Sequence, residues 1–145
     1  MKFYQEVKIK TSKFENIVES FHNINFVKFL TYLQPIRIIH WDGIEDNKTA
    51  FFKLWFLGWN NFKVIHSNYK NNSNELFFID KGTELPLGLK SWSHKHTIKK
   101  NKNYVSIIDS LDIEHSNKLF GYILYPILIF PIIIRIFLYK IYFKK

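Results

Sequence analysis

Two histidines and one aspartate stand where an antiparallel hairpin would bring them together. His94 and His96 are two residues apart in the alternating stretch 91–99, so they share one face of an expected strand with apolar neighbours. Asp109 is the acid on the apolar face of the next expected strand, 104–113. Three roles are open for such a group: a buried hydrogen-bonded pair, the polar end of an apolar cavity that orients a ligand carbonyl or hydroxyl, or a proton-transfer site.

The turn between these two expected strands decides which histidine faces the acid. A two-residue turn at Asn101-Lys102 places His94 opposite Asp109. A register shifted by two residues places His96 opposite the same acid. In both registers a histidine lies opposite Asp109, the acid of an otherwise apolar strand face. Such a buried polar pair either holds the strands in register or contacts a ligand.

Aromatic residues are candidates for the wall of an apolar ligand cavity. They make up 19% of the chain, although aromatic side chains in a half-buried sheet also serve as ordinary core. The ligand-binding residues expected from the sequence are Trp41, Trp55, Trp59, Trp92, His94, His96, Asp109 and Tyr122. No residue is assigned a catalytic role.

Several other kinds of site have no support in the sequence. The chain contains no cysteine, which excludes thiol nucleophiles, disulfide scaffolds and zinc sites built on cysteine. The other histidines show no regular metal-ligand spacing, and His94, His96 and Asp109 at most imitate a site of two histidines and one carboxylate. The sequence has neither a phosphate-binding loop nor the Gly-x-Ser-x-Gly elbow of hydrolases. We therefore expect no cofactor and no metal.

The formal net charge of +9 is divided unevenly along the chain. Residues 119–145 hold four basic residues and no acid, which leaves a net charge of +5 for residues 1–118. This mildly basic body does not predict a nucleic-acid partner. The first residues contain no apolar stretch suitable for a signal peptide, so we expect a cytoplasmic location.

The elements that must position these residues follow from the hydrophobic pattern. Residues 2–11 alternate like a strand, and a capping box from Ser12 to Glu15 starts the first of two short helices. Consecutive strands joined by short turns then imply an antiparallel meander, which must bury one face. The length of 145 residues fits a single domain, 1–145. The expected later strands are 36–41, 48–58, 61–69, 75–81, 91–99 and 104–113.

The order of these elements and several short motifs resemble the START-like, or SRPBCC, superfamily. Residues 78–82, Phe-Ile-Asp-Lys-Gly, followed by residues 89–96, Leu-Lys-Ser-Trp-Ser-His-Lys-His, are similar to a pattern of small bacterial ligand-binding members. Residues 105–112 resemble the following strand with its inward Asp, and residues 135–140, Arg-Ile-Phe-Leu-Tyr-Lys, resemble the terminal helix. The resemblance covers nearly the whole chain.

This resemblance implies the α+β helix-grip fold of lipid-transfer START domains, polyketide cyclases and the birch-pollen allergen. The expected fold is a curved seven-stranded antiparallel sheet with two short helices after the first strand and a long C-terminal helix. An apolar cavity is expected between the sheet and that helix. The group has no uniform catalytic residues, so none are carried over to this chain.

Residues 119–145 are expected to form the C-terminal apolar helix. Within them, residues 119–134 carry no charge and contain Pro126 and Pro131. At ~1.5 Å per residue this stretch spans about 24 Å, short of the roughly 30 Å hydrocarbon core of a bilayer. Three placements stay open: a helix that covers the sheet and bends near its prolines, a transmembrane anchor over residues 119–143, and a helix on a membrane surface.

The function expected from the sequence is the non-catalytic binding of a lipophilic small molecule between the sheet and the C-terminal helix. One alternative is a cyclase- or dehydratase-like enzyme that uses His94 or His96 to move a proton. Another is a membrane-attached protein anchored by residues 119–143. A homodimer is a further candidate, because both faces of the stretch 49–58 are largely apolar.

Overall fold

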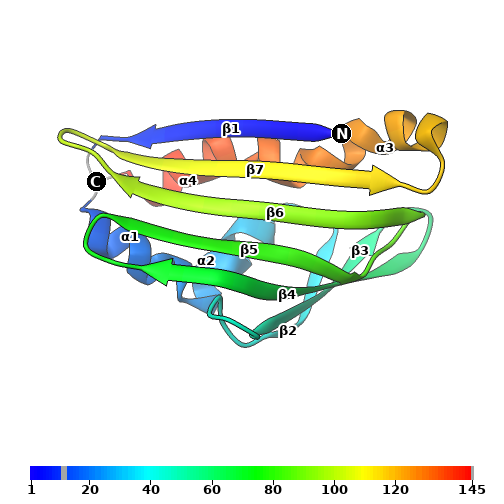
Figure 1. Ribbon diagram of the computed structural model, residues 1–145, viewed down its shortest axis with the longest axis horizontal. Helices are drawn as coiled ribbons and strands as arrows, with labels where there is room; N and C mark the ends of the chain where they lie inside the picture. Colours follow the sequence, from blue (N-terminus) through cyan, green and yellow to red (C-terminus); the bar gives the residue numbers. More distant parts are fainter. Residues whose placement is uncertain (11–12, 145) are drawn as a thin grey trace.

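Seven antiparallel strands form one curved sheet, and the helices lie on one side of it (Figure 1). The computed structural model describes residues 1–10 and 13–144. The strands pair in the order β1-β7-β6-β5-β4-β3-β2, so the first strand lies beside the last. The expected α+β architecture is confirmed. The strands are β1 (Lys2–Ile9), β2 (Ile36–Trp41), β3 (Thr49–Trp55), β4 (Trp59–Asn71), β5 (Glu75–Glu84), β6 (Leu89–Lys100) and β7 (Val105–His115).

The hairpin between β6 and β7 has the shifted register. Residues 101–104 form its loop, and His96 pairs with Asp109, while His94 lies one inward position further along β6. The two-residue turn at Asn101-Lys102 is therefore wrong. Two-residue hairpin turns usually need positive φ at both central residues, and a lysine at the second position does not favour that backbone.

Two short helices follow β1 and pack behind one end of the sheet (Figure 1). Helix α2 (Ile24–Thr31) begins after Asn23, whose side chain accepts a hydrogen bond from the backbone of Asn25. Of the expected capping box, Ser12 lies outside the described residues. Helix α1 (Phe14–Phe21) buries one face in the core, and the residues of that face are Phe14, Ile17 and Phe21.

The C-terminal segment forms two helices rather than one continuous helix. Helix α3 (Lys118–Ile133) contains Pro126 and Pro131, and helix α4 (Arg135–Tyr142) follows after a break at Ile134. Each proline removes one helical hydrogen bond and crowds the preceding turn, which bends or interrupts a helix. The expected C-terminal helical segment is confirmed, and its interruption at Ile134 lies just beyond Pro131, near the prolines where the sequence predicts a bend.

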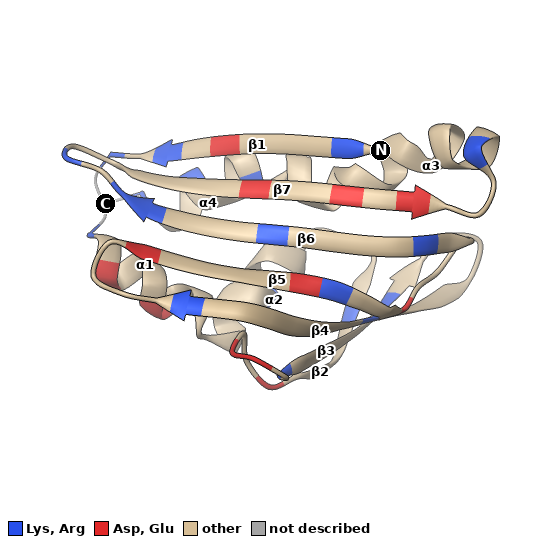
Figure 2. Cartoon of the chain, in the orientation of Figure 1, with Lys and Arg blue, Asp and Glu red and all other residues tan. Residues whose placement is uncertain are grey.

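Helix α3 lies against the sheet with one face and meets solvent with the other. Its buried face includes Leu128, Ile129 and Ile132, which pack with Leu111 and Ile113 of β7. Charged residues are spread over the strands, whereas α3 carries a charge only in its first turn (Figure 2). The span 118–142 is long and apolar enough to cross a membrane by length and composition, but 22% of its apolar window is buried inside the protein.

Candidate functional site

A cavity of about 620 Å³ lies between the sheet and the helices. The strands contribute Phe52, Phe62 and Trp92 to its wall, α2 contributes Leu30, and α3 contributes Leu128. The rings of Phe62 and Trp92 meet edge to face with their centres 4.9 Å apart, a favourable geometry that fixes this part of the wall. The volume and the apolar lining are those of a small-molecule site.

The cavity reaches solvent between β3 and α3. Trp55, Ile127 and Phe130 line the cavity and are also 52%, 44% and 52% exposed. Large apolar side chains that are at once lining and exposed mark the mouth. A ligand that enters here passes the outward side of α3.

The structure places the expected aromatic residues in two groups. Trp59 and Tyr122 are not part of the cavity lining. The Trp59 ring lies under the guanidinium of Arg37 at 4.1 Å, and Tyr122 is 67% exposed on α3. Ligand contact stays a prediction for the tryptophans that do line the cavity, which are Trp41, Trp55 and Trp92.

Polar side chains form a first row across three strands at the inner end of the cavity. His66 on β4 pairs with Asp80 on β5, and Asp80 pairs with His94 on β6. The Nε2 atom of His66 lies 3.0 Å from Asp80 Oδ1, and His94 Nδ1 lies 4.0 Å from Asp80 Oδ2. The row follows from strand geometry, because residues directly opposite each other project to the same face of a sheet.

A second row lies beside the first and is centred on Asp109. This residue of β7 pairs with His96 on β6 and with Gln5 on β1. Asp109 is 0% exposed, and its Oδ1 accepts a 2.9 Å hydrogen bond from His94 Nε2. His96 joins the two rows, because its Nε2 donates to Asp80 Oδ2 at 2.9 Å. The sequence prediction that a histidine meets Asp109 thus holds for both histidines.

Helix α4 completes the polar end from the opposite side. The Tyr139 hydroxyl donates to Asp109 Oδ2 at 3.1 Å, and Arg135 Nη1 lies 3.5 Å from Asp109 Oδ1. The side chains of Arg135 and Asp80 keep 19% and 18% of their exposure and both line the cavity. Within the described residues, the buried Nε of Arg135 has no hydrogen-bond partner. These two charged groups are therefore the ones that an occupant of the cavity meets.

Comparison with solved structures identifies this arrangement of sheet, helices and cavity. Norcoclaurine synthase from Thalictrum flavum superposes with a TM-score of 0.62 at 15% identity, covering 95% of this chain and 83% of that one. Major latex-like protein 151 of Panax ginseng gives 0.57 at 15% identity, covering 82% of each chain. The Aha1 dimer of Colwellia psychrerythraea gives 0.55 at 12% identity and 84% coverage of each chain. This chain has the START-like helix-grip fold of the SRPBCC superfamily.

At these identities the likeness shows the fold alone, and the resemblance found in the sequence is confirmed at that level. No family model and no curated protein sequence matches the chain. The chemistry of this particular helix-grip cavity must therefore be argued from its own residues.

Charge at the polar end of the helix-grip cavity is set by two ionised carboxylates. Burial opposes ionisation of Asp109, but the hydrogen bond from His94 and the charge of Arg135 hold the pKa of Asp109 well below its usual range. The pKa of Asp80 is also well below its usual range, because the charges and hydrogen bonds of His96 and His66 outweigh burial. Both side chains are carboxylates at neutral pH.

The pKa values of two histidines beside them, His94 and His66, are shifted in opposite directions. Burial, reinforced by the neighbouring His96, lowers the pKa of His94 to about 4, so its ring is neutral at pH 7. His66 Nδ1 lies 2.8 Å from the Lys48 carbonyl, and its Nε2 lies 3.0 Å from Asp80 Oδ1. Accordingly, although burial opposes it, Asp80 raises the pKa of His66.

Sequence reasoning missed five of the eight residues that this polar end gathers from the described chain. His66 and Asp80 lie on the apolar faces of their strands, next to Val64 and Phe78, in the same alternating pattern that singled out Asp109. The alternation rule applied to every strand would have found both residues. The remaining members come from distant elements and left no local signal: Gln5, Arg135 and Tyr139.

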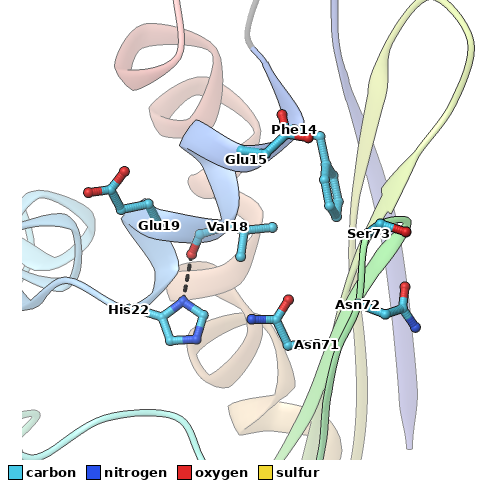
Figure 3. A pocket seen from close by; sticks show the side chains of 8 residues that line it. All are labelled: Phe14, Glu15, Val18, Glu19, His22, Asn71, Asn72 and Ser73. Carbon is cyan, nitrogen blue, oxygen red and sulfur yellow. Dashed lines mark hydrogen bonds between the residues drawn. The ribbon is translucent and has the colours of Figure 1, made fainter.

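A second depression lies between α1 and the turn that joins β4 to β5. Figure 3 shows its lining, which includes Phe14, Val18, His22 and Asn71, and it has a volume of about 410 Å³. His22 Nδ1 donates to the Val18 carbonyl at 2.7 Å, so this histidine is used to hold the helix end. We place the functional site in the helix-grip cavity instead, because the buried ionised groups gather there.

Proposed function

We propose that the protein binds a lipophilic small molecule whose neutral polar group, a hydroxyl or a carbonyl, meets the inner end of the cavity. The observation that carries the proposal is the apolar chamber of about 620 Å³ that ends at Asp80 and Arg135. The apolar walls supply affinity at ~25 cal/mol per Å² of buried apolar surface. The polar end supplies orientation, as a few placed polar groups do in small-molecule sites.

The charge balance of the polar end favours a neutral group over an anion. Asp80 and Asp109 contribute two negative charges, and Arg135 contributes one positive charge. A ligand hydroxyl can donate to Asp80 and accept from the free Nε of Arg135. A ligand carboxylate would bring an uncompensated charge into a buried site, which is costly.

The first experiment compares ligands that share a chain and differ in the head group. Purified protein, stripped of bound lipid, is loaded with a fluorescent fatty-chain probe and titrated with hexadecanol and with hexadecanoate. We expect both to displace the probe and the alcohol to do so at a concentration at least about tenfold lower, equal to about 1.4 kcal/mol of binding free energy. Displacement by neither compound would contradict the proposal, and a preference for hexadecanoate would contradict the neutral head group.

The other functions expected from the sequence stay predictions. Norcoclaurine synthase is a structural neighbour that is an enzyme, and an Aha1 neighbour is a dimer, but at this identity neither property transfers to the chain. A proton-transfer role for His94 or His96 and a homodimer are thus untested. The neutral ring of His94 is compatible with orienting a ligand and with accepting a proton.

A second candidate function, association with an anionic membrane surface, is favoured by the outward face of α3. Phe120, Ile123, Ile127 and Phe130 repeat every three or four residues and are 44–60% exposed, so they form one apolar stripe on the helix. The segment that carries the stripe holds only basic charges, including Lys118. Exposed apolar side chains beside basic charges can bury in the interface of an anionic membrane, although α3 lacks the strongly polar face of most interfacial helices. The mouth of the cavity opens beside the stripe, so a ligand would load from the bilayer.

Vesicle flotation tests this candidate without touching the cavity. Wild-type protein is expected to float with vesicles of phosphatidylcholine and phosphatidylglycerol and to be released by high salt. The double variant Phe120→Glu/Ile123→Glu should stay in solution, whereas Tyr4→Glu, which changes a 62% exposed residue on β1, should float normally. Equal flotation of the double variant, or no flotation of the wild type, would reject membrane association through α3.

A further inference from the structure

We infer that Asp80, His94 and His96 form a binding site for a divalent transition-metal ion of the class of Zn²⁺. One ligand atom from each of the three residues lies within 4.8 Å of the others. The sequence suggested at most an imitation of such a site with Asp109 as the carboxylate. In the structure the carboxylate of the cluster is Asp80 rather than Asp109. Asp109 instead accepts a hydrogen bond from His94 Nε2. The inference does not depend on the apolar ligand proposed above.

The spacing of the three side chains matches metal coordination. A tetrahedral ion with bonds of ~2.0–2.2 Å separates its ligand atoms by roughly 3.3–3.6 Å. His94 Nδ1 lies 4.0 Å from Asp80 Oδ2, a little beyond that range. His96 Nε2 lies 2.9 Å from the same Asp80 oxygen, a separation that two ligands of one ion also show. Closing the three groups around an ion needs small side-chain adjustments and the tautomer of His96 that carries its proton on Nδ1, which lies 3.5 Å from Asp109 Oδ1.

His94 supports the inference because its cavity-facing nitrogen has no use within the protein. Its Nε2–H donates to Asp109 at 2.9 Å, which leaves a lone pair on Nδ1. Among the described residues no donor bonds to this Nδ1, and His94 is only 2% exposed. The Nδ1 lone pair and the Asp80 carboxylate therefore face each other as two acceptors, an arrangement that a cation between them relieves.

The residues around the cluster are placed as outer partners of a metal centre. Metal-bound histidines usually donate their other N–H to a carboxylate, which fixes the ring and raises its basicity. Asp109 holds His94 in this way, and its Oδ1 lies 3.5 Å from His96 Nδ1, a buried nitrogen without another partner. The second oxygen of Asp80, Oδ1, lies 3.0 Å from His66 Nε2.

The donor set selects the kind of ion and leaves room for a ligand. Two imidazole nitrogens and one carboxylate oxygen suit Zn²⁺ and its first-row neighbours better than Ca²⁺ or Mg²⁺, which prefer oxygen. Three protein ligands leave a coordination position open, as in catalytic rather than structural zinc sites. That position faces the cavity, which all three residues line. Arg135 opposes the entry of a cation, but its guanidinium faces Asp109, the carboxylate that does not coordinate.

Cobalt titration of the chelator-treated protein tests the site directly. We expect saturable binding of one Co²⁺ per chain, with visible absorption bands of four- or five-coordinate cobalt that Zn²⁺ removes. His94→Gln, His96→Gln and Asp80→Asn should each weaken binding by more than the about 10- to 100-fold expected for loss of an outer partner. His40→Gln is the matched control, because His40 pairs with Asp42 at 3.5 Å on the surface, away from the cavity.

A measurement on the wild-type chain covers the case in which the cluster variants fail to fold. Zinc titration followed by long-range ¹H–¹⁵N spectra of the histidine rings should shift Nδ1 of His94 and Nε2 of His96 and leave His40 unchanged. The inference is overturned if no saturable binding occurs, if the folded cluster variants bind as the wild type does, or if other ring nitrogens shift instead. Probe displacement by hexadecanol remains an independent result, so failure here does not touch the ligand proposal.

Discussion

Replacing Asp109 by alanine is expected to lower the free energy of unfolding by about 3 to 5 kcal/mol, the usual cost of removing one partner from a buried ionic group. Asp109 is fully buried and accepts hydrogen bonds from His94 Nε2 at 2.9 Å and from the Tyr139 hydroxyl at 3.1 Å. Its loss leaves these donors unpaired and removes the nearest negative charge from Arg135 at 3.5 Å. Equilibrium denaturation in urea, followed by circular dichroism, measures the change.

The control for this experiment lies on the same strand. Asp112→Ala changes an exposed aspartate of β7, three residues further on, and should alter stability by less than about 0.5 kcal/mol. Asp80→Ala is expected to cost less than Asp109→Ala, because the Asp80 side chain keeps 18% of its exposure to the cavity. An Asp109 variant within 1 kcal/mol of the wild type would show that Asp109 is not the centre of the polar network.

The inward face of the hairpin was predictable because alternation is a local property. His94, His96 and Asp109 lie on the concave face as expected, whichever register the strands adopt. The register itself was not predictable from the turn, since the actual loop has no strong sequence signal. A shift by two residues keeps every side chain on the same face of the sheet. The predicted inward positions of the two histidines and Asp109 are therefore correct even though the predicted turn is wrong.

Contacts between distant elements could not be predicted in this way. The pairing of β4 with β5 contains two register shifts, so the sequence does not show that His66 faces Asp80. Arg135 and Tyr139 reach Asp109 only because the chain breaks at Ile134 and redirects α4 toward β1 and β7. The sequence predicts a bend near Pro126 and Pro131 but does not show which way the helix continues after it.

Filling the cavity is expected to weaken ligand binding by more than about tenfold while leaving the fold intact. Ala50 on β3 lines the cavity opposite Val64 of β4, and its small side chain leaves space there. In Ala50→Phe the ring takes volume that a bound chain would occupy. Losing contact with only two methylene groups costs about 1.6 kcal/mol, which already weakens binding more than about tenfold. Titration with the fluorescent fatty-chain probe measures the change in Kd.

A phenylalanine on the other face of the same strand separates cavity filling from general disturbance of β3. Lys53→Phe adds a similar ring at a position that does not line the cavity and should bind the probe with unchanged Kd. Overpacking can itself destabilise a core, so thermal unfolding must first show that Ala50→Phe is folded; if it is not, Leu54→Trp, nearer the mouth, makes the same test. A folded variant that keeps the wild-type Kd would mean that the probe sits on the exposed stripe of α3, and the chamber would then not be the binding site.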